Sequence, residues 1–184
     1  FAQRMSDPMA VMLSVIAFVY FCMVSSAVYL INDVRDCEED RLHPEKCRRP
    51  IASGELPVQT ALTAAVVLAL VGIVGSFAVN VALGAVTLSY FVLQMAYQAA
   101  LKRMVLLDVF AIAGGFVLRA VAGAEAISVV ISPWLLICTL LLALFLGLAK
   151  RRGELSALPQ GSIGHRETLD RYSIGMLDHL ISAM

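Results

Sequence analysis

Three aspartates stand in a short polar stretch at a spacing that suits a divalent cation. Asp33, Asp36 and Asp40 follow one another at i, i+3 and i+7, and Asn32 immediately precedes them. On a helix this spacing places all three carboxylates on one face. Like charges so placed repel one another unless a cation offsets them. Mg²⁺ is a hard cation that one or two carboxylates hold together with substrate phosphates, so the spacing predicts a magnesium site.

Basic residues follow the acidic ones, after a predicted helix break at His43 and Pro44. Lys46, Arg48 and Arg49 lie close together there. Carboxylates for a metal, followed by basic groups for an anion, are what a magnesium–pyrophosphate site requires. The alternative is a solvated acidic loop between two membrane helices. Membrane topology does not require acidic residues in such a loop, because Asp and Glu contribute little to the orientation of a protein in the membrane.

The composition of the chain indicates a membrane protein. Of its 184 residues, 60% are hydrophobic and 15% are charged, whereas soluble domains carry about 25% charged residues. The formal net charge is zero, so we expect no nucleic-acid partner. The four cysteines lack the paired short spacing of zinc sites and are expected to be free thiols on a reducing face.

Long apolar runs must position the polar residues. A helix that spans the hydrocarbon core needs about 20 mainly apolar residues, and open sheets do not occur in lipid. We expect an all-α, polytopic transmembrane bundle that forms a single domain over residues 1–184. Because both ends of the chain look cut, we expect a fragment of a longer protein. The expected helices cover residues 9–32, 57–79, 82–101, 105–125, 131–149 and 168–184.

The connections between these helices differ in charge. The first, third and fifth connections, residues 33–55, 102–104 and 150–167, carry nearly all the basic loop residues. If the helices alternate in direction, these three connections lie on the same side, and the positive-inside rule places that side in the cytoplasm. We therefore expect an integral protein of the inner (cell) membrane, whose polar loops meet at a site that faces the cytoplasm.

Two stretches resemble the UbiA superfamily of intramembrane prenyltransferases. The stretch "NDVRDCEEDRLHPEKCRRPIASG", which begins at Asn32, resembles the first signature of that family. A second, weaker likeness is "YQAALKR", from Tyr97 to Arg103. The resemblance covers essentially the whole chain. It implies a UbiA-like helical fold from which the first and last helices are missing, the cofactor Mg²⁺ and a diphosphate substrate.

The chain departs from ordinary members of that family at one place. Where they carry a second Asp-rich motif, this chain has "LAKRRGEL", which includes Lys150, Arg151, Arg152 and Glu154. A basic cluster suits a substrate that bears an additional phosphate. The pattern is similar to the branch of decaprenyl-phosphate phosphoribosyltransferases. That branch uses phosphoribosyl pyrophosphate as donor and a membrane polyprenyl phosphate lipid as acceptor.

The resemblance also implies roles for individual residues. Asp33, Asp36 and Asp40, assisted by Asn32, would be the catalytic acids that hold Mg²⁺ on the pyrophosphate. The lipid phosphate would attack the anomeric carbon, so no side-chain nucleophile is expected. The residues expected to contact substrate phosphates are Arg48, Arg49, Tyr97, Lys102, Arg103, Lys150, Arg151 and Arg152.

Further candidates lie in the second half of the chain. Asp108 is read as a residue that begins a helix or pairs with a nearby base, in preference to a metal ligand. Arg119 lies at membrane depth, where a charge is costly, and either ties helices together or contacts an anion in a cavity. Glu154 and Tyr172 are further candidates to complete the pocket.

Two other functions stay open at this point. The first is transfer of a prenyl group from a prenyl diphosphate to an aromatic or lipid acceptor. The second is a non-catalytic channel or transporter, although the two halves show no internal repeat of the kind found in many transporters. The polyprenyl chain length, the downstream pathway and the oligomeric state are not predicted.

Overall fold

The computed structural model describes residues 6–157 and 172–184. Within those ranges all regular structure is helical, so the all-α expectation is confirmed. Two 3₁₀ turns, Lys46–Arg48 and Leu101–Arg103, lie between helices. The helices are α1 (Pro8–Arg35), α2 (Cys37–Leu42), α3 (Val58–Val79), α4 (Val81–Ala99), α5 (Leu107–Ala126), α6 (Pro133–Ala157) and α7 (Ile174–Ser182).

Five helices in the described part are long and apolar enough to cross a membrane, namely α1, α3, α4, α5 and α6. Two of them run past the ends expected from hydropathy. α1 continues to Arg35, and α6 continues through the basic cluster to Ala157. The extension of α6 is rich in Arg, Lys, Glu and Leu, which are good helix formers, and neither extension contains a proline that would interrupt the backbone hydrogen bonds. Of the helix expected over residues 168–184, α7 is described, whereas residues 168–171 lie outside the described ranges.

The chain forms two compact units, Phe1–Phe91 with Ala122–Val129, and Val92–Val121 with Val130–Met184. The first unit contains α1, α2 and α3, and the second contains α6 and α7. The expectation that residues 1–184 form a single membrane domain stays a prediction.

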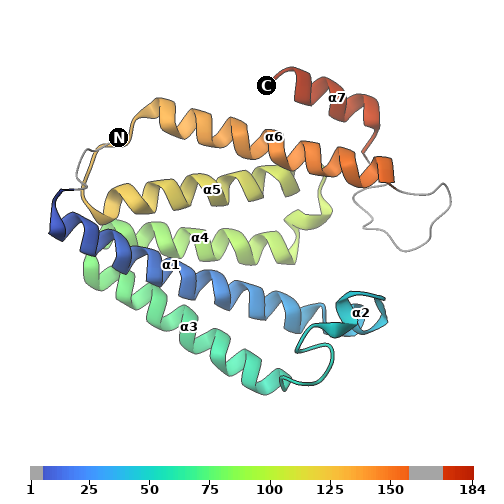
Figure 1. The fold of residues 1–184 in the computed structure, drawn as a ribbon, viewed down its shortest axis with the longest axis horizontal. Helices are drawn as coiled ribbons and strands as arrows, with labels where there is room; N and C mark the ends of the chain where they lie inside the picture. Colours follow the sequence, from blue (N-terminus) through green and yellow to red (C-terminus); the bar gives the residue numbers. More distant parts are fainter. Residues whose placement is uncertain (1–5, 158–171) are drawn as a thin grey trace. The chain divides into compact units, whose positions relative to one another are not determined.

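In the first unit α1 packs along α3 (Figure 1). Small side chains line this contact, and Ala27, Ala65 and Ala69 are buried there. At Gly72 the backbones approach so closely that an added Cβ would lie 2.6 Å from Val24 Cγ2 and 2.9 Å from the Tyr20 carbonyl oxygen. Small residues allow membrane helices to approach in this way. The contact sets the position of the polar end of α1.

In the second unit α6 packs against α7 (Figure 1). Their apolar core includes Leu144 and Leu148 of α6, Leu177 of α7, and Val109 near the start of α5. Gly147 admits the Val109 side chain, since an added Cβ would lie 2.6 Å from Val109 Cγ1. This core holds together the helix ends that carry the charged residues of the second unit.

The close approach at Gly72 yields a stability prediction. We expect Gly72→Ala to destabilise the protein by about 1–3 kcal/mol, because the added methyl group meets the fixed Tyr20 carbonyl. The control is Gly123→Ala, where no described atom lies within 4 Å of the added Cβ. The fraction that stays monodisperse on size exclusion after heating in detergent measures the effect. Equal heat resistance of both variants would contradict the α1–α3 packing.

Candidate functional site

The end of α1 and the short helix α2 position the acidic residues. α1 ends at Arg35, and Asp36 joins it to α2. Helical bonding nevertheless bridges this junction, because the Asp36 N–H donates to the Asn32 carbonyl at 2.9 Å and the Asp40 N–H donates to the Asp36 carbonyl at 2.8 Å. The nearly continuous helix carries Asp33 and Asp40 to the same side.

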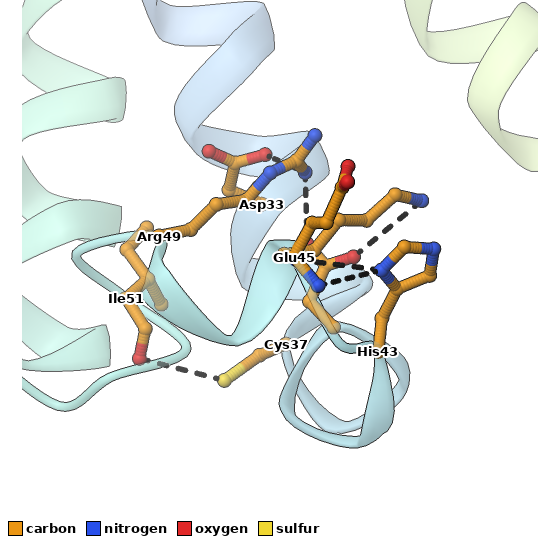
Figure 2. A network of polar contacts seen from close by, with 8 residues as sticks. Asp33, Cys37, His43, Glu45, Arg49 and Ile51 are labelled. Carbon is orange, nitrogen blue, oxygen red and sulfur yellow. Dashed lines mark hydrogen bonds and ion pairs between the residues drawn. The ribbon is translucent and has the colours of Figure 1, made fainter.

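One guanidinium nitrogen of Arg49 contacts both of these carboxylates, and Figure 2 shows Arg49 beside Asp33. Arg49 Nη1 donates to Asp33 Oδ1 at 2.9 Å and to Asp40 Oδ2 at 2.8 Å. Because both oxygens contact the same nitrogen, Asp33 Oδ1 and Asp40 Oδ2 cannot lie farther apart than the sum of these two distances. Lys46 Nζ lies 3.8 Å from the other oxygen of Asp40. Asp40 is almost fully buried, at 3% exposure, so its charge needs these cationic partners.

The loop that presents Arg49 is held at both sides (Figure 2). The buried Cys37 Sγ donates to the Ile51 carbonyl at 3.7 Å, and Arg41 Nε donates to the Ala52 carbonyl at 3.2 Å. His43 Nδ1 accepts the backbone N–H of Glu45 at 3.2 Å, which closes the turn after α2. The imidazole therefore has a local structural role here. The bridge from Arg49 to both aspartates is a contact that sequence reasoning missed.

The acidic pair fits the demands of Mg²⁺ in its donor chemistry. No group of three or more His, Cys, Asp or Glu residues in the described ranges is arranged to hold a metal. Mg²⁺ bound through substrate phosphates needs only one or two carboxylates, because phosphate oxygens and waters supply the other ligands. Oxygens of Asp33 and Asp40 already converge on a single cationic atom. Two hard donors around one cation position therefore suit the ion that the sequence predicts.

The other residues predicted for this site lie near Asp33 and Asp40 along the chain. Asn32 and Asp36 are half-buried at the junction between α1 and α2, and Arg48 is exposed in the 3₁₀ turn. The structure thus brings Asp33, Asp40 and Arg49 into direct contact.

A second, buried polar cluster lies in the second unit around Asp108, which is fully buried. Arg151 Nε donates to Asp108 Oδ2 at 3.0 Å, and the Tyr172 hydroxyl donates to Asp108 Oδ1 at 2.6 Å. Arg151 Nη1 also donates to Glu154 Oε2 at 2.8 Å. Asp108 is thus an ion-pair partner, but its partner is Arg151, 43 residues away, rather than a nearby base.

Tyr172 connects this cluster to a strained backbone position. Leu106 has a φ of +67°, which is rare for a residue other than glycine, and its N–H donates to the Tyr172 hydroxyl at 2.7 Å. Burial, together with the hydrogen bond to Asp108, raises the pKa of Tyr172 to about 12. The phenol therefore stays protonated at physiological pH and donates to the buried carboxylate.

The remaining basic candidates of the second unit differ in their surroundings. Arg152 pairs with Asp178 of α7, and Lys150 is exposed. Arg119 is exposed, and its guanidinium carbon lies 5.3 Å from the centre of the Phe116 ring on the same helix. That the basic residues of this unit meet the acids of the first unit stays a prediction. Tyr97 and Lys102 are half-buried and Arg103 is exposed, at and just after the end of α4.

The raised pKa of Tyr172 gives a pH prediction. The ordinary pKa is 10.0 and the value in the folded protein is about 12. The stabilisation from this phenol is therefore complete below about pH 10 and is lost as the pH rises through about 12. We expect the absorbance titration at 295 nm of the wild type, minus that of Tyr172→Phe, to show one phenol that ionises near pH 12.

Asp108→Asn tests the contribution of the carboxylate. The variant leaves Tyr172 buried but removes the charge that opposes ionisation, so the pKa of Tyr172 should fall part of the way toward 10. A Tyr172 phenol that already ionises near pH 10 in the wild type would contradict the buried cluster.

Residues 1–152 match the model of a known protein family, which is described as the UbiA prenyltransferase family. Relatives named decaprenyl-phosphate phosphoribosyltransferase, from Mycobacterium tuberculosis (strain H37Rv) and Corynebacterium glutamicum, are 37% and 41% identical to this chain. Those matches cover 85% and 86% of this chain and 52% and 48% of the relatives. The chain therefore spans about half the length of the curated relatives it matches.

A solved structure shows the same fold. A UbiA homologue from Archaeoglobus fulgidus, bound to DMAPP and Mg²⁺, aligns with a TM-score of 0.70 at 18% identity, over 82% of this chain and 54% of that one. At this identity the likeness shows the fold alone. The family match extends over most of the chain, and its predicted signature lies at the paired acids. This chain belongs to the UbiA prenyltransferase family.

Proposed function

We propose that this protein is a Mg²⁺-dependent transferase that moves a phosphoribosyl group from phosphoribosyl pyrophosphate to a polyprenyl phosphate, such as decaprenyl phosphate. The observation that carries the proposal is the convergence of Asp33 and Asp40 on one cationic atom at the end of a membrane-length helix. The names of the relatives, decaprenyl-phosphate phosphoribosyltransferase, support this choice of substrates. The five candidate spans and the family make the chain an integral membrane protein.

In this proposal the acids of the first unit hold the metal and the donor together. Asp33 and Asp40, with Asp36 and Asn32 beside them, would bind Mg²⁺. When bound, the ion neutralises charge that develops on the departing pyrophosphate. Arg48 and Arg49 follow the acids closely and would donate to pyrophosphate oxygens, since guanidinium groups bind phosphate in a bidentate manner.

The bond changes are simple and require no protein nucleophile. The C–O bond between the anomeric carbon and pyrophosphate breaks, and its electron pair leaves with the pyrophosphate. A phosphate oxygen of the lipid forms the new C–O bond to the same carbon. The protein's part is to orient both phosphates and to stabilise the leaving charge electrostatically.

The basic cluster of α6 would recognise a further phosphate. Lys150 is exposed and is the best placed of the three. Arg151 and Arg152 already pair with Asp108 and Asp178, so they are better placed to hold the cluster in position. Tyr97, Lys102 and Arg103 would add donors. We place the site at the cytoplasmic face of the inner membrane, because the basic loops favour that side.

A second candidate is prenyl transfer from a prenyl diphosphate to an aromatic or lipid acceptor. It is favoured by the description of the matching family, which names prenyltransferases. The same acids would serve both reactions, since each breaks a C–O bond to pyrophosphate. The donors differ in that only phosphoribosyl pyrophosphate brings a further phosphate for the basic cluster.

A donor-choice assay tests the proposal. Membranes that contain the protein are incubated with Mg²⁺, labelled phosphoribosyl pyrophosphate and decaprenyl phosphate. We expect a labelled lipid, a loss of about 100-fold for Asp33→Ala as a metal ligand, and a loss of about tenfold for Lys150→Ala as a phosphate contact. Glu39→Ala, an exposed acid of α2, is the matched control and should keep its activity.

Two outcomes of the same assay would contradict the proposal. Turnover of a prenyl diphosphate with an aromatic acid, without any labelled lipid from phosphoribosyl pyrophosphate, would favour the second candidate. A labelled lipid that forms equally well with Asp33→Ala would contradict the role of the acids.

A further inference from the structure

Both oxygens of the buried Asp40 carboxylate face cations. Arg49 Nη1 lies 2.8 Å from Oδ2, and Lys46 Nζ lies 3.8 Å from Oδ1. The same Arg49 nitrogen also contacts Asp33 Oδ1 at 2.9 Å. The acids that are proposed to ligate Mg²⁺ are therefore already neutralised by side chains of the following loop.

A metal ion and this guanidinium compete for the same oxygens. Asp33 and Asp40 would hold a metal ion with the same carboxylates that now accept hydrogen bonds from Arg49, and two cations on the same carboxylates repel each other strongly. Binding of the metal therefore requires Arg49 to leave. Arg49 is able to move, because its side chain is 39% exposed and it follows a single 3₁₀ turn rather than a helix.

We propose that Arg49 is an exchangeable counter-ion that couples metal binding to diphosphate binding. This inference rests on the proposed function. Arg49 would leave the aspartates when they bind the metal, and its guanidinium would gain a new anionic partner when diphosphate binds. Each ligand then strengthens the binding of the other, and this coupling is reciprocal. The metal alone binds weakly, since it leaves Arg49 without a partner.

A purely structural ion pair would behave differently. If Arg49 only tied its loop to α2, its loss would loosen the acids and weaken metal binding. If Arg49 is a competitor, its loss strengthens the binding of metal alone but weakens the binding of diphosphate with metal. The two roles therefore predict opposite signs for the same measurement.

The test uses Mn²⁺, whose free fraction is measured by electron paramagnetic resonance, with the purified protein in detergent. We expect Arg49→Gln to bind Mn²⁺ alone about tenfold more tightly than the wild type. We expect the same variant to bind labelled inorganic pyrophosphate at saturating Mg²⁺ about tenfold more weakly. The control is Arg35→Gln, which removes the same charge from an exposed residue in the last turn of α1; both affinities should change less than twofold.

A labelling experiment on the wild type keeps the proposal falsifiable if Arg49→Gln does not fold. Phenylglyoxal modifies accessible guanidinium groups, and peptide mapping reports the extent at each arginine. We expect Mn²⁺ alone to increase modification of Arg49 and added pyrophosphate to decrease it, with Arg41 unchanged. Unchanged labelling of Arg49 on addition of Mn²⁺, or unchanged or weaker Mn²⁺ binding by Arg49→Gln, would overturn the exchange.

Failure of the proposed function looks different. A wild-type protein that binds neither Mn²⁺ nor pyrophosphate, in any combination, overturns both the magnesium site and the exchange. A wild type that binds both, with affinities that Arg49→Gln leaves unchanged, overturns the exchange alone.

Discussion

The structure depends on how carboxylates are neutralised at the end of a membrane helix. Asp40 is almost fully buried, and a buried charge without a partner is costly. The chain meets this need with Arg49, whose single nitrogen serves Asp40 and Asp33 together. The polar loop after α2 follows from this constraint, because it must return to bring Arg49 back to the acids. The proposed metal site is therefore stabilised here by the guanidinium group of Arg49.

Most of the charged side chains described in the second unit also lie near helix ends, with Arg119 in the body of α5 as an exception. In the second unit Arg151 bridges Asp108 and Glu154, while Tyr172 completes the bonding of Asp108. The apolar helix bodies pack through small residues and close contacts such as those at Gly72 and Gly147. Rigid helices thus present polar groups at their ends, and this is how a helical membrane protein builds a site without placing charges in lipid.

Local patterns predicted much of the fold and part of the site. Hydropathy predicted the five membrane-length helices, and the spacing of Asp33 and Asp40 predicted their common face, because both signals depend only on near neighbours. The contacts of Arg49 were harder to predict, since they depend on the path of the loop from His43 to Ile51. The pairing of Asp108 with Arg151 and Tyr172 joins residues 43 and 64 positions apart, and no local pattern encodes it.

The central claim is that Asp33 and Asp40 hold a metal ion on a diphosphate. Crystals of the protein grown with Mn²⁺ and phosphoribosyl pyrophosphate test it directly, because Mn²⁺ scatters anomalously. The account predicts an anomalous peak bonded to carboxylate oxygens of both aspartates, with phosphorus density beside it and Arg49 on the phosphate. Both carboxylates still bound to Arg49, with the anomalous and phosphorus peaks elsewhere in the same crystal, would contradict it.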